Sequence, residues 1–417
     1  MRLDLVCEGN EFAIDGIGIS EIVKIHPTPF YLYSAQVIRS NFECLRANLP
    51  GFDIFYSFKA NPSLRICRIL RELGSGADIS SRGELAAALY VGFSPDDIAF
   101  VGPGKSRDEI EQAIASGIFA IVVESTDELE LVDEIARQKG RSVRILLRIN
   151  TLEEPISPEM MVGGPSKFGF DEEVVVDEVG SKKLTNARIE GIHVYSASQV
   201  LDANFISKHI DYVADLALRL ASEIGFDLRC VDFGGGFGVP YGDESPLNLD
   251  PIRVAAERAR RVLLGKHEGC RLIFEIGRYV VAEAGVFVTR VLRVKRSRGK
   301  QFVITDAGMN HFTRPVLMRA RHPIRILNKI SEPPRVTCDV VGPICTPVDV
   351  SGRDVNLPEP EPGDLIGIFN AGAYGYSMSA LNFMSLGFPA EIIVDQGKVE
   401  IMRKARSASD SFGDQKV

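Results

Sequence analysis

The residues most able to do chemistry in this sequence stand where short apolar runs end. Lys59 follows the run DIFYSF, Glu275 and Arg278 lie in FEIGR, and the glycines at 234–236 follow VDF. A lysine amine can bond to an aldehyde, bare glycine N–H groups suit a phosphate, and a carboxylate can bind a protonated ring nitrogen. These groups could act together only if the fold brings the ends of their runs to one place.

Each of these residues also has an ordinary structural interpretation. A lone lysine at a strand end is more often ion-paired or extended to solvent, and Glu275 could simply pair with Arg278. Glycine-rich turns end many strands, and the spacing here is not the G-x-G-x-x-G of a dinucleotide site. The choice between the two interpretations depends on the surrounding elements.

The middle of the chain alternates short apolar strands with amphipathic helices. Stretches such as SRDEIEQAIASG carry apolar residues three and four apart, which predicts helices. Eight strands in alternation with helices favour an α/β fold of the (β/α)8 TIM-like barrel type, with an open doubly wound sheet as the alternative. The predicted strands are DIFYSF, GADIS, DIAFVG, AIVVES, VRILLRIN, IEGIHVYS, LRCVDFGG and RLIFEIG.

The rest of the chain predicts a C-terminal β-rich domain. Runs such as QFVITDAG, DLIGIFNAG and PAEIIVDQGKVEIM are separated by turns rather than by helices. The opening segment, MRLDLVCEGNEFAIDGIGIS, resembles a hairpin. We predict N-terminal strands over 1–30 that join the β-domain, a barrel over 31–285, the β-domain over 286–405, and a flexible polar tail over 406–417.

In a barrel of this type, active sites form where the strands end and the loops begin. Five predicted strands end in chemically capable residues, and such agreement predicts an active site. A lysine, a glycine cradle and a carboxylate are together what pyridoxal 5′-phosphate requires. The strand-end residues are Lys59; Asp78 and Glu84; Tyr195 and Ser198; Gly234, Gly235 and Gly236; and Glu275 and Arg278.

Bulk composition narrows the possible partners. The chain has 417 residues, of which 45% are hydrophobic and 25% charged, as in ordinary globular proteins. A net charge of −8 argues against nucleic acid or an anionic membrane as the main partner. The N-terminus lacks a signal-peptide pattern and no apolar run spans a bilayer, so a cytoplasmic location is expected. Seven scattered cysteines without a C-x-x-C predict no metal site.

The ordered motifs resemble those of the fold-type III pyridoxal-phosphate decarboxylases, a family that includes diaminopimelate and ornithine decarboxylases. The resemblance covers roughly residues 28–392. It implies a barrel with a β-domain, and a head-to-tail homodimer whose active sites are shared. The motifs that carry it are FYSFKANP, GADISSRGEL, VGPGKS, SKFGF, GIHVYSASQ, DFGGGFGVPY, FEIGRYVVAEAG, DAGMNHFTRP, GPICTPVD and NAGAYGYSMS.

The resemblance also implies roles for single residues. Lys59 would carry the cofactor as a Schiff base, and Cys345 of the second subunit would reprotonate the product carbon. Glu275 would bond the ring nitrogen, and Tyr195 would cover the ring face where the family usually has a histidine. The other implied cofactor residues are Asp78, Ser198, Gly234, Gly235, Gly236, Gly277, Arg278 and Tyr374, and the implied substrate residues are Arg278, Arg314, Thr346 and Asp349.

Departures from the family pattern concern the substrate. In diaminopimelate decarboxylases an acid follows the catalytic cysteine and binds the distal amine, but here Thr346 follows Cys345. Arg278 and Arg314 match the pair that binds the distal carboxylate. GPICTPVD and the segment SALNFMSLGFP resemble a side branch that includes the carrier-protein-linked glutamyl decarboxylase of butirosin synthesis and the citryl-diaminopropionate decarboxylase of siderophore synthesis.

The sequence therefore predicts α-decarboxylation of an amino acid, or a small or carrier-tethered conjugate, with a carboxylated or acylated far end. Secondary metabolism or siderophore-type biosynthesis is the expected setting. Two alternatives stay open: a diaminopimelate decarboxylase of lysine biosynthesis with a changed amine contact, and a non-catalytic homologue that only binds the cofactor. Non-catalytic homologues tend to lose the lysine or the cysteine, and both Lys59 and Cys345 are present.

Overall fold

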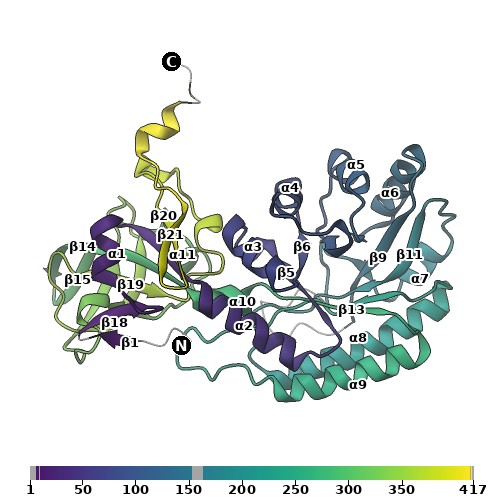
Figure 1. Cartoon of the computed structure of the whole chain (residues 1–417), viewed down its shortest axis with the longest axis horizontal. Coiled ribbons are helices and arrows are strands. Elements are labelled where there is room, and N and C mark those ends of the chain that lie inside the picture. Colours follow the sequence, from purple (N-terminus) through teal and green to yellow (C-terminus); the bar gives the residue numbers. More distant parts are fainter. Residues whose placement is uncertain (1–5, 9, 153–162, 414, 416–417) are drawn as a thin grey trace. The chain divides into compact units, whose positions relative to one another are not determined.

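The computed structural model describes residues 6–8, 10–152, 163–413 and 415. The chain divides into two compact units, seen in Figure 1. The barrel unit comprises residues 42–239 and 245–279, and the β-rich unit comprises residues up to 41, 240–244, and 280 onward.

The barrel unit contains eight parallel strands in a closed sheet. Each strand pairs with the next one along the chain, and the last pairs with the first, so the sheet has no free edge. The predicted barrel is therefore confirmed, and the open doubly wound sheet is wrong. The strands are β5 (Asp53–Ser57), β6 (Gly76–Ile79), β7 (Ile98–Phe100), β8 (Ala120–Val123), β9 (Val143–Asn150), β11 (Ala187–His193), β12 (Cys230–Asp232) and β13 (Arg271–Glu275).

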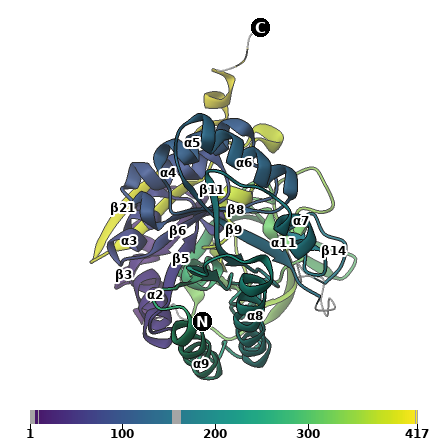
Figure 2. The same ribbon diagram turned by 90° about the vertical axis from the view of Figure 1, so that its right-hand side faces the viewer.

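Helices surround these strands (Figure 2). Three of them begin with the same local signal, a serine whose hydroxyl accepts the N–H of a glutamate three residues later. Such caps stabilise a helix start by about 1 kcal/mol each and fix the loop that precedes it. The three capped helices are α4 (Arg82–Val91), α5 (Arg107–Ser116) and α6 (Thr126–Gln138), and the others are α3 (Leu64–Glu72), α7 (Val175–Gly180), α8 (Ala203–Ile224) and α9 (Asp250–Lys266).

Apolar side chains fill the barrel. Phe55, Val122, Leu146 and Ile273, from four different strands, are all fully buried and belong to one cluster. This packed interior holds the strands at fixed positions, and the polar groups described below lie at their carboxyl ends.

The β-rich unit is built on one large sheet. Its strands follow the order β18, β17, β15, β14, β4, β20 and β21, with β19 pairing with β14 and β16 pairing with β19. The bounds are β4 (Phe30–Ser34), β14 (Gly285–Ser297), β15 (Lys300–Thr305), β16 (Ile324–Ile326), β17 (Val336–Val341), β18 (Val350–Leu357), β19 (Leu365–Phe369), β20 (Ala390–Asp395) and β21 (Lys398–Arg403). A short helix, α11 (Arg314–Leu317), follows β15. The predicted C-terminal β-rich domain is therefore confirmed.

The N-terminal segment belongs to the β-rich unit but forms a sheet of its own. The strands β1 (Val6–Glu8), β2 (Glu11–Ile14) and β3 (Ile17–Gly18) form a three-stranded sheet of their own, and β4 is the segment that enters the large sheet. The small sheet ends at α1 (Ile19–Ile25), where the Ser20 hydroxyl donates to Glu11 at 3.0 Å.

The limits of the two units lie inside helices. They fall within α2 (Ala35–Asn48) and α10 (Arg278–Val281). In the tail, Ala408–Phe412 forms a short 3-10 helix.

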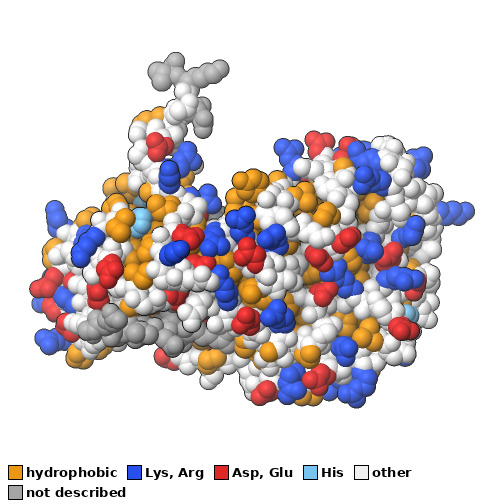
Figure 3. Space-filling model, in the orientation of Figure 1, with side chains coloured by type: hydrophobic (Ala, Val, Ile, Leu, Met, Phe, Trp, Pro, Cys, Tyr) orange, Lys and Arg blue, Asp and Glu red, His pale blue; other side chains and the backbone are white. Residues whose placement is uncertain are grey.

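Among the residues described, no helix is long and apolar enough to cross a bilayer. Figure 3 shows acidic and basic side chains interspersed on the face displayed.

Candidate active site

Lys59 lies in a short 3-10 turn, Phe58–Ala60, that directly follows β5. Its flanking residues are buried, which fixes the turn. The Lys59 Nζ atom lies 3.3 Å from Asp78 Oδ2 and 5.3 Å from the centroid of the Tyr195 ring. The amine is therefore held between a carboxyl group on β6 and an aromatic face beyond β11, while 38% of its side chain remains exposed.

Asp78 is fully buried. Burial raises the pKa of its carboxyl group, the charge of Glu275 raises it further, and Lys59 lowers it. Asp78 thus holds a proton more readily than an ordinary aspartate does. Glu84 has a different task, because its carboxylate accepts the Ser80 N–H at 2.7 Å at the start of α4. Burial is the main cause that raises the pKa of Glu84 to about 6.

The glycine turn after β12 admits no other residue type. Gly234 and Gly236 have φ angles of 64° and 87°. A Cβ atom on Gly235 would lie 1.7 Å from the Glu275 carbonyl oxygen, and one on Gly236 would lie 2.0 Å from the Ala197 carbonyl oxygen. Within the described chain, the N–H groups of Gly235 and Gly236 donate to no protein acceptor. The turn therefore presents two available donors, which suits a phosphate group.

Further donors lie at the ends of β11 and β13. The Arg278 guanidinium donates to the Ser198 hydroxyl at 3.3 Å. Gly277 allows the end of β13 to approach the Lys59 turn, because a Cβ atom there would lie 2.8 Å from the Ala60 Cβ and 3.1 Å from the Ser57 Cβ.

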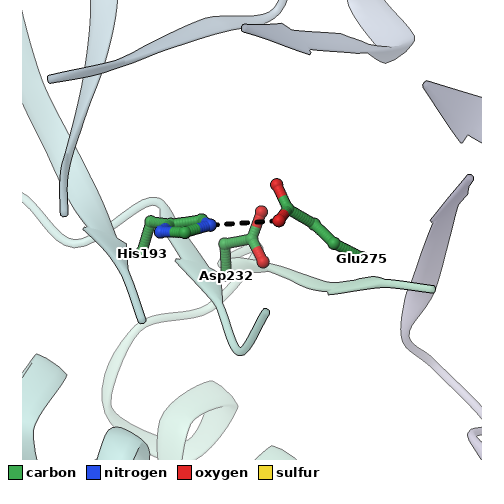
Figure 4. A group of neighbouring side chains, drawn as sticks. All are labelled: His193, Asp232 and Glu275. Atoms are coloured by element: carbon green, nitrogen blue, oxygen red, sulfur yellow. Dashed lines mark hydrogen bonds and ion pairs between the residues drawn. The ribbon is translucent and has the colours of Figure 1, made fainter. Parts of the chain in front are cut away.

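Three buried ionisable side chains meet at the ends of β11, β12 and β13: His193, Asp232 and Glu275 (Figure 4). The His193 Nε2 atom lies 3.1 Å from Glu275 Oε2, and each of these two side chains is 1% exposed. Asp232 accepts the Gly234 N–H at 2.9 Å. The trio therefore links the glycine turn to the carboxylate that the sequence singled out.

The pKa values of the two carboxyl groups in this trio are shifted in opposite directions. Burial raises the pKa of Glu275, but His193 and Lys59 outweigh it and bring that pKa down to about 2. Burial and the adjacent Glu275 charge hold the pKa of Asp232 well above its ordinary value. Glu275 is therefore the group that ionises readily, and Asp232 holds a proton more readily than an ordinary aspartate does.

One carboxylate oxygen of Glu275 is available to accept a further hydrogen bond. Its Oε1 atom is buried and has no hydrogen-bond partner among the described residues. A buried anionic oxygen without a donor is costly, so the arrangement fits a bound group that presents a protonated ring nitrogen. A histidine, an aspartate and a glutamate can also bind a metal ion, and these three side chains bring ligand atoms close together; here His193 Nε2 and Glu275 Oε2 are joined by a hydrogen bond.

Cys345 belongs to the β-rich unit, in the loop between β17 and β18. It is exposed and has no disulfide partner. Its N–H group contacts the Met384 Sδ atom at 3.4 Å. Asp349 is buried and shapes this loop by accepting the N–H groups of Met309 at 2.7 Å and Ile344 at 2.8 Å. Its implied contact with substrate stays a prediction.

Arg314, at the start of α11, is 6% exposed, so it is not a surface ion-pair residue. Its guanidinium carbon lies 4.6 Å from the Tyr241 ring centroid and its Nη1 donates to His322 Nε2 at 3.0 Å. The Nδ1–H of His322 donates to the Phe369 carbonyl at 2.8 Å, so Nε2 carries a lone pair and the ring is neutral. His322 therefore orients Arg314 without repelling it.

The structure brings together one part of the predicted site. The barrel unit gathers Lys59, Asp78, Tyr195 and Glu275, with the glycine turn and the Ser198–Arg278 pair at neighbouring strand ends. The others lie in the β-rich unit, and their approach to the barrel residues stays a prediction. They are Cys345, Thr346, Asp349, Arg314 and Tyr374.

Two participants were not predicted, His193 and Asp232. His193 stands two residues before Tyr195, and alternation along a strand places such residues on the same face. Asp232 directly precedes the FGGG turn. The alternation of side chains along the strand could therefore have identified His193. Its position beside Asp232 follows only from the strand register, in which the two residues lie opposite each other.

Comparisons with known proteins agree with this geometry. The family described as "Pyridoxal-dependent decarboxylase, pyridoxal binding domain" matches residues 35–282. The L-glutamyl-[BtrI acyl-carrier protein] decarboxylase of Niallia circulans is 36% identical over 411 residues, covering 95% of this chain and 96% of that protein. The diaminopimelate decarboxylase of Aquifex aeolicus is 35% identical over 399 residues, covering 94% and 93%.

A solved structure shares the fold. The diaminopimelate decarboxylase of M. jannaschii, in complex with L-lysine, superposes with a TM-score of 0.90 at 29% identity, covering 100% of this chain and 98% of that one. A closed barrel with a lysine, a glycine turn and a buried carboxylate at its strand ends fits pyridoxal phosphate, the cofactor of the family that matches residues 35–282. The chain belongs to the pyridoxal-dependent decarboxylase family: it is an amino-acid carboxy-lyase, and its cofactor is pyridoxal 5′-phosphate.

Proposed function

We propose that the enzyme removes the α-carboxylate of an amino acid, or of an amino-acid conjugate, whose far end is carboxylated or acylated. The substrate is a small molecule or is presented on a carrier. The observation that carries this proposal is the surroundings of Thr346. Thr346 follows the predicted catalytic cysteine, and it cannot pair with a distal ammonium group.

The acid nearest in sequence does not replace that partner. Asp349 lies three residues later, but both of its oxygens accept backbone N–H groups and burial raises its pKa. An ammonium group bound here would therefore lose its charge partner. Such a loss costs on the order of 2–5 kcal/mol, enough to decide specificity. Arg314, by contrast, offers a guanidinium group suited to a carboxylate.

The barrel residues would divide the chemistry as follows. When bound, pyridoxal phosphate supplies an electron sink for the bond that releases carbon dioxide. Lys59 would hold the cofactor covalently and release it to the substrate amine, and Asp78 would keep that amine in place. Glu275 would keep the ring nitrogen protonated. Tyr195 would lie against the ring face.

The remaining assigned residues would bind the phosphate, or bind and protonate the substrate. Gly234, Gly235, Gly236, Ser198, Arg278 and Tyr374 would surround the phosphate, with Gly277 allowing the close approach of β13. Arg278 would contribute to the substrate site together with Arg314. Cys345 would deliver the proton that replaces the carboxylate on the α-carbon.

We also propose a homodimer in which Cys345 serves the partner's active site. Apolar side chains exposed on the single chain gather on the segments around this cysteine, and large exposed apolar patches mark interfaces. They include Leu317, Met318, Val348, Phe383, Met384 and Leu386, which are 40–60% exposed. A second copy of the chain covering them would also exclude water from Cys345.

Diaminopimelate decarboxylation is the second candidate. It is supported by the matching arginines, Arg278 and Arg314, and by relatives named for that activity. It would require that another group replace the acid missing at Thr346. The proposed substrate class is instead supported by the Niallia circulans relative, whose name specifies a glutamyl group on an acyl-carrier protein.

A substrate panel tests the proposal. Purified enzyme is offered meso-diaminopimelate, lysine, ornithine, glutamate and acylated or carrier-tethered amino acids, and products are identified by mass. We expect carbon dioxide loss from the acylated or carboxylated compounds. Thr346→Glu is the matched variant, and it should raise kcat/KM for meso-diaminopimelate by roughly 30-fold or more, because it restores a partner for the amine. Rapid formation of lysine by the unaltered enzyme would refute the proposal.

A further inference from the structure

The β-rich unit contains a cavity of about 660 Å³ next to α11. One wall is formed by the segment that follows α11, and the other by β18 and the residues just before it. Neither segment contributes to the barrel site described above. The first wall includes Arg319, Arg321 and His322, and the second includes Val348, Val350 and Arg353.

The cavity is positively charged. Arg319 and Arg321 are exposed, and within the described chain neither forms a hydrogen bond or an ion pair. Arg353 also lines it, with its guanidinium 3.7 Å from the Asp339 carboxylate. The acid on the wall, Asp354, is 3.3 Å from the Lys300 amine, which offsets its charge. Two arginines therefore remain to attract an anion.

One wall continues directly into Arg314, which is predicted to contact the substrate, and the other continues into the Cys345 loop, which the proposed homodimer assigns to the partner's active site. His322 forms part of the wall and also accepts the hydrogen bond from Arg314. Val348 and Val350 flank Asp349, whose side chain holds Ile344 beside Cys345. A substrate that extends beyond Arg314 would thus pass along the segments that line this cavity.

We infer that the cavity binds an anionic group at the far end of the substrate, beyond the group that Arg314 contacts. Free guanidinium groups bind carboxylates and phosphates with paired, charge-assisted hydrogen bonds. The anion can come from two sources: the phosphate of the pantetheine arm by which a carrier holds its acyl group, or a carboxylate on a small acyl group. The inference rests on the proposed function, because only an acylated substrate is long enough to carry such a group.

The test uses matched pairs of substrates with the intact holoenzyme. One pair is an aminoacyl pantetheine thioester with and without its 4′-phosphate, and the other is an amino acid acylated with succinate or with butanoate. The quantity measured is the ratio of kcat/KM for the anionic member to that for the neutral member. We expect a ratio of about ten or more for at least one pair, since each bond to a charged group contributes a sizeable share of binding. The pair that shows the preference identifies the source of the anion.

Variants connect this preference to the cavity. The double variant Arg319→Gln with Arg321→Gln should bring the ratio close to one. The matched control, Arg298→Gln with Arg335→Gln, removes the same charge from exposed arginines that do not line the cavity and should keep the wild-type ratio. A wild-type ratio near one for both pairs, or a ratio that survives in the Arg319 and Arg321 variant, overturns the inference and leaves the proposed function standing.

A binding measurement separates the two proposals if no acylated amino acid is turned over. That result would refute the proposed substrate class. Calorimetric titration of the holoenzyme with 4′-phosphopantetheine and with succinate then tests anion binding in the cavity independently of turnover. Binding that is at least tenfold weaker in the double variant than in its control supports an anion site. The inference is overturned if neither 4′-phosphopantetheine nor succinate binds, or if the double variant and its control bind them equally.

Discussion

The two buried carboxyl groups at the ends of β12 and β13 should respond oppositely to the same chemical change. Glu275→Gln and Asp232→Asn each replace a carboxyl group by an amide of nearly the same shape. The Glu275 pKa of about 2 makes this group an anion at neutral pH, whereas burial and the Glu275 charge raise the pKa of Asp232 well above its ordinary value. We predict that Asp232 is protonated at pH 7. Only the first substitution therefore removes a charge.

The expected sizes follow from these charge states. A hydrogen bond to a charged group contributes about 1.5–3 kcal/mol, so Glu275→Gln should lower kcat roughly 10- to 150-fold. Asn at position 232 can still accept the Gly234 N–H that Asp232 accepts at 2.9 Å. Asp232→Asn should therefore change kcat less than about threefold, which corresponds to about 0.7 kcal/mol.

The assay is steady-state decarboxylation at pH 7, with the visible absorption of the bound cofactor recorded for each variant. Equal cofactor content in both variants shows that any difference in kcat arises from charge rather than from lost binding. A fall in kcat for Asp232→Asn as large as that for Glu275→Gln would refute the assignment of a proton to Asp232.

The free energy of unfolding should also depend on the two pKa shifts in opposite ways. The depressed pKa of Glu275 stabilises the fold above the ordinary glutamate pKa of 4.5, and this contribution is lost as pH falls through about 2. A raised pKa has the reverse effect, so the buried Asp232 costs stability above its ordinary pKa of 3.8. Asp232→Asn should therefore gain stability relative to the unaltered protein between pH 4 and pH 7, as measured by urea unfolding; a loss over that range would contradict the assignment.

Three further substitutions test other parts of the site. Gly235→Ala places a methyl group 1.7 Å from the Glu275 carbonyl oxygen, so the turn must move and cofactor affinity should fall at least tenfold by spectroscopic titration; unchanged affinity would exclude the turn from the phosphate site. Arg314→Ala should raise KM steeply with the cofactor spectrum intact, and an unchanged KM would remove Arg314 from the substrate site. Cys345→Ala should slow product formation or divert it to an aldehyde by misplaced protonation, and normal kinetics would indicate a different acid.

The barrel was predictable because each of its strands has a clear local signal. Buried apolar runs alternate with helical patterns, and serine caps such as those before α4 and α5 mark the helix starts. The strand limits were less accurate where backbone conformation decides them. The run LRCVDFGG predicts eight residues, yet β12 ends at Asp232, because the left-handed conformation of Gly234 turns the chain out of the sheet.

Only the parts of the site that single residues identify could be predicted from the sequence. Lys59, the glycines and Glu275 are recognisable from type and position. The His193–Asp232–Glu275 trio depends instead on strand register and barrel closure, which no local pattern encodes. The N-terminal strands illustrate the same limit, since the sequence suggested a hairpin that joins the β-domain but did not indicate a separate three-stranded sheet.

The central claim is that Lys59 carries the cofactor, and reductive trapping tests it most directly. The holoenzyme is treated with borohydride, digested, and the modified lysine located by mass spectrometry. Lys105 is the built-in comparison, because it also follows a barrel strand, but its side chain is 1% exposed and its amine donates to Gly102, Val122 and Glu128. We expect the pyridoxyl label on Lys59 and none on Lys105. A label on Lys105 or any other lysine, with Lys59 unmodified, would contradict the account.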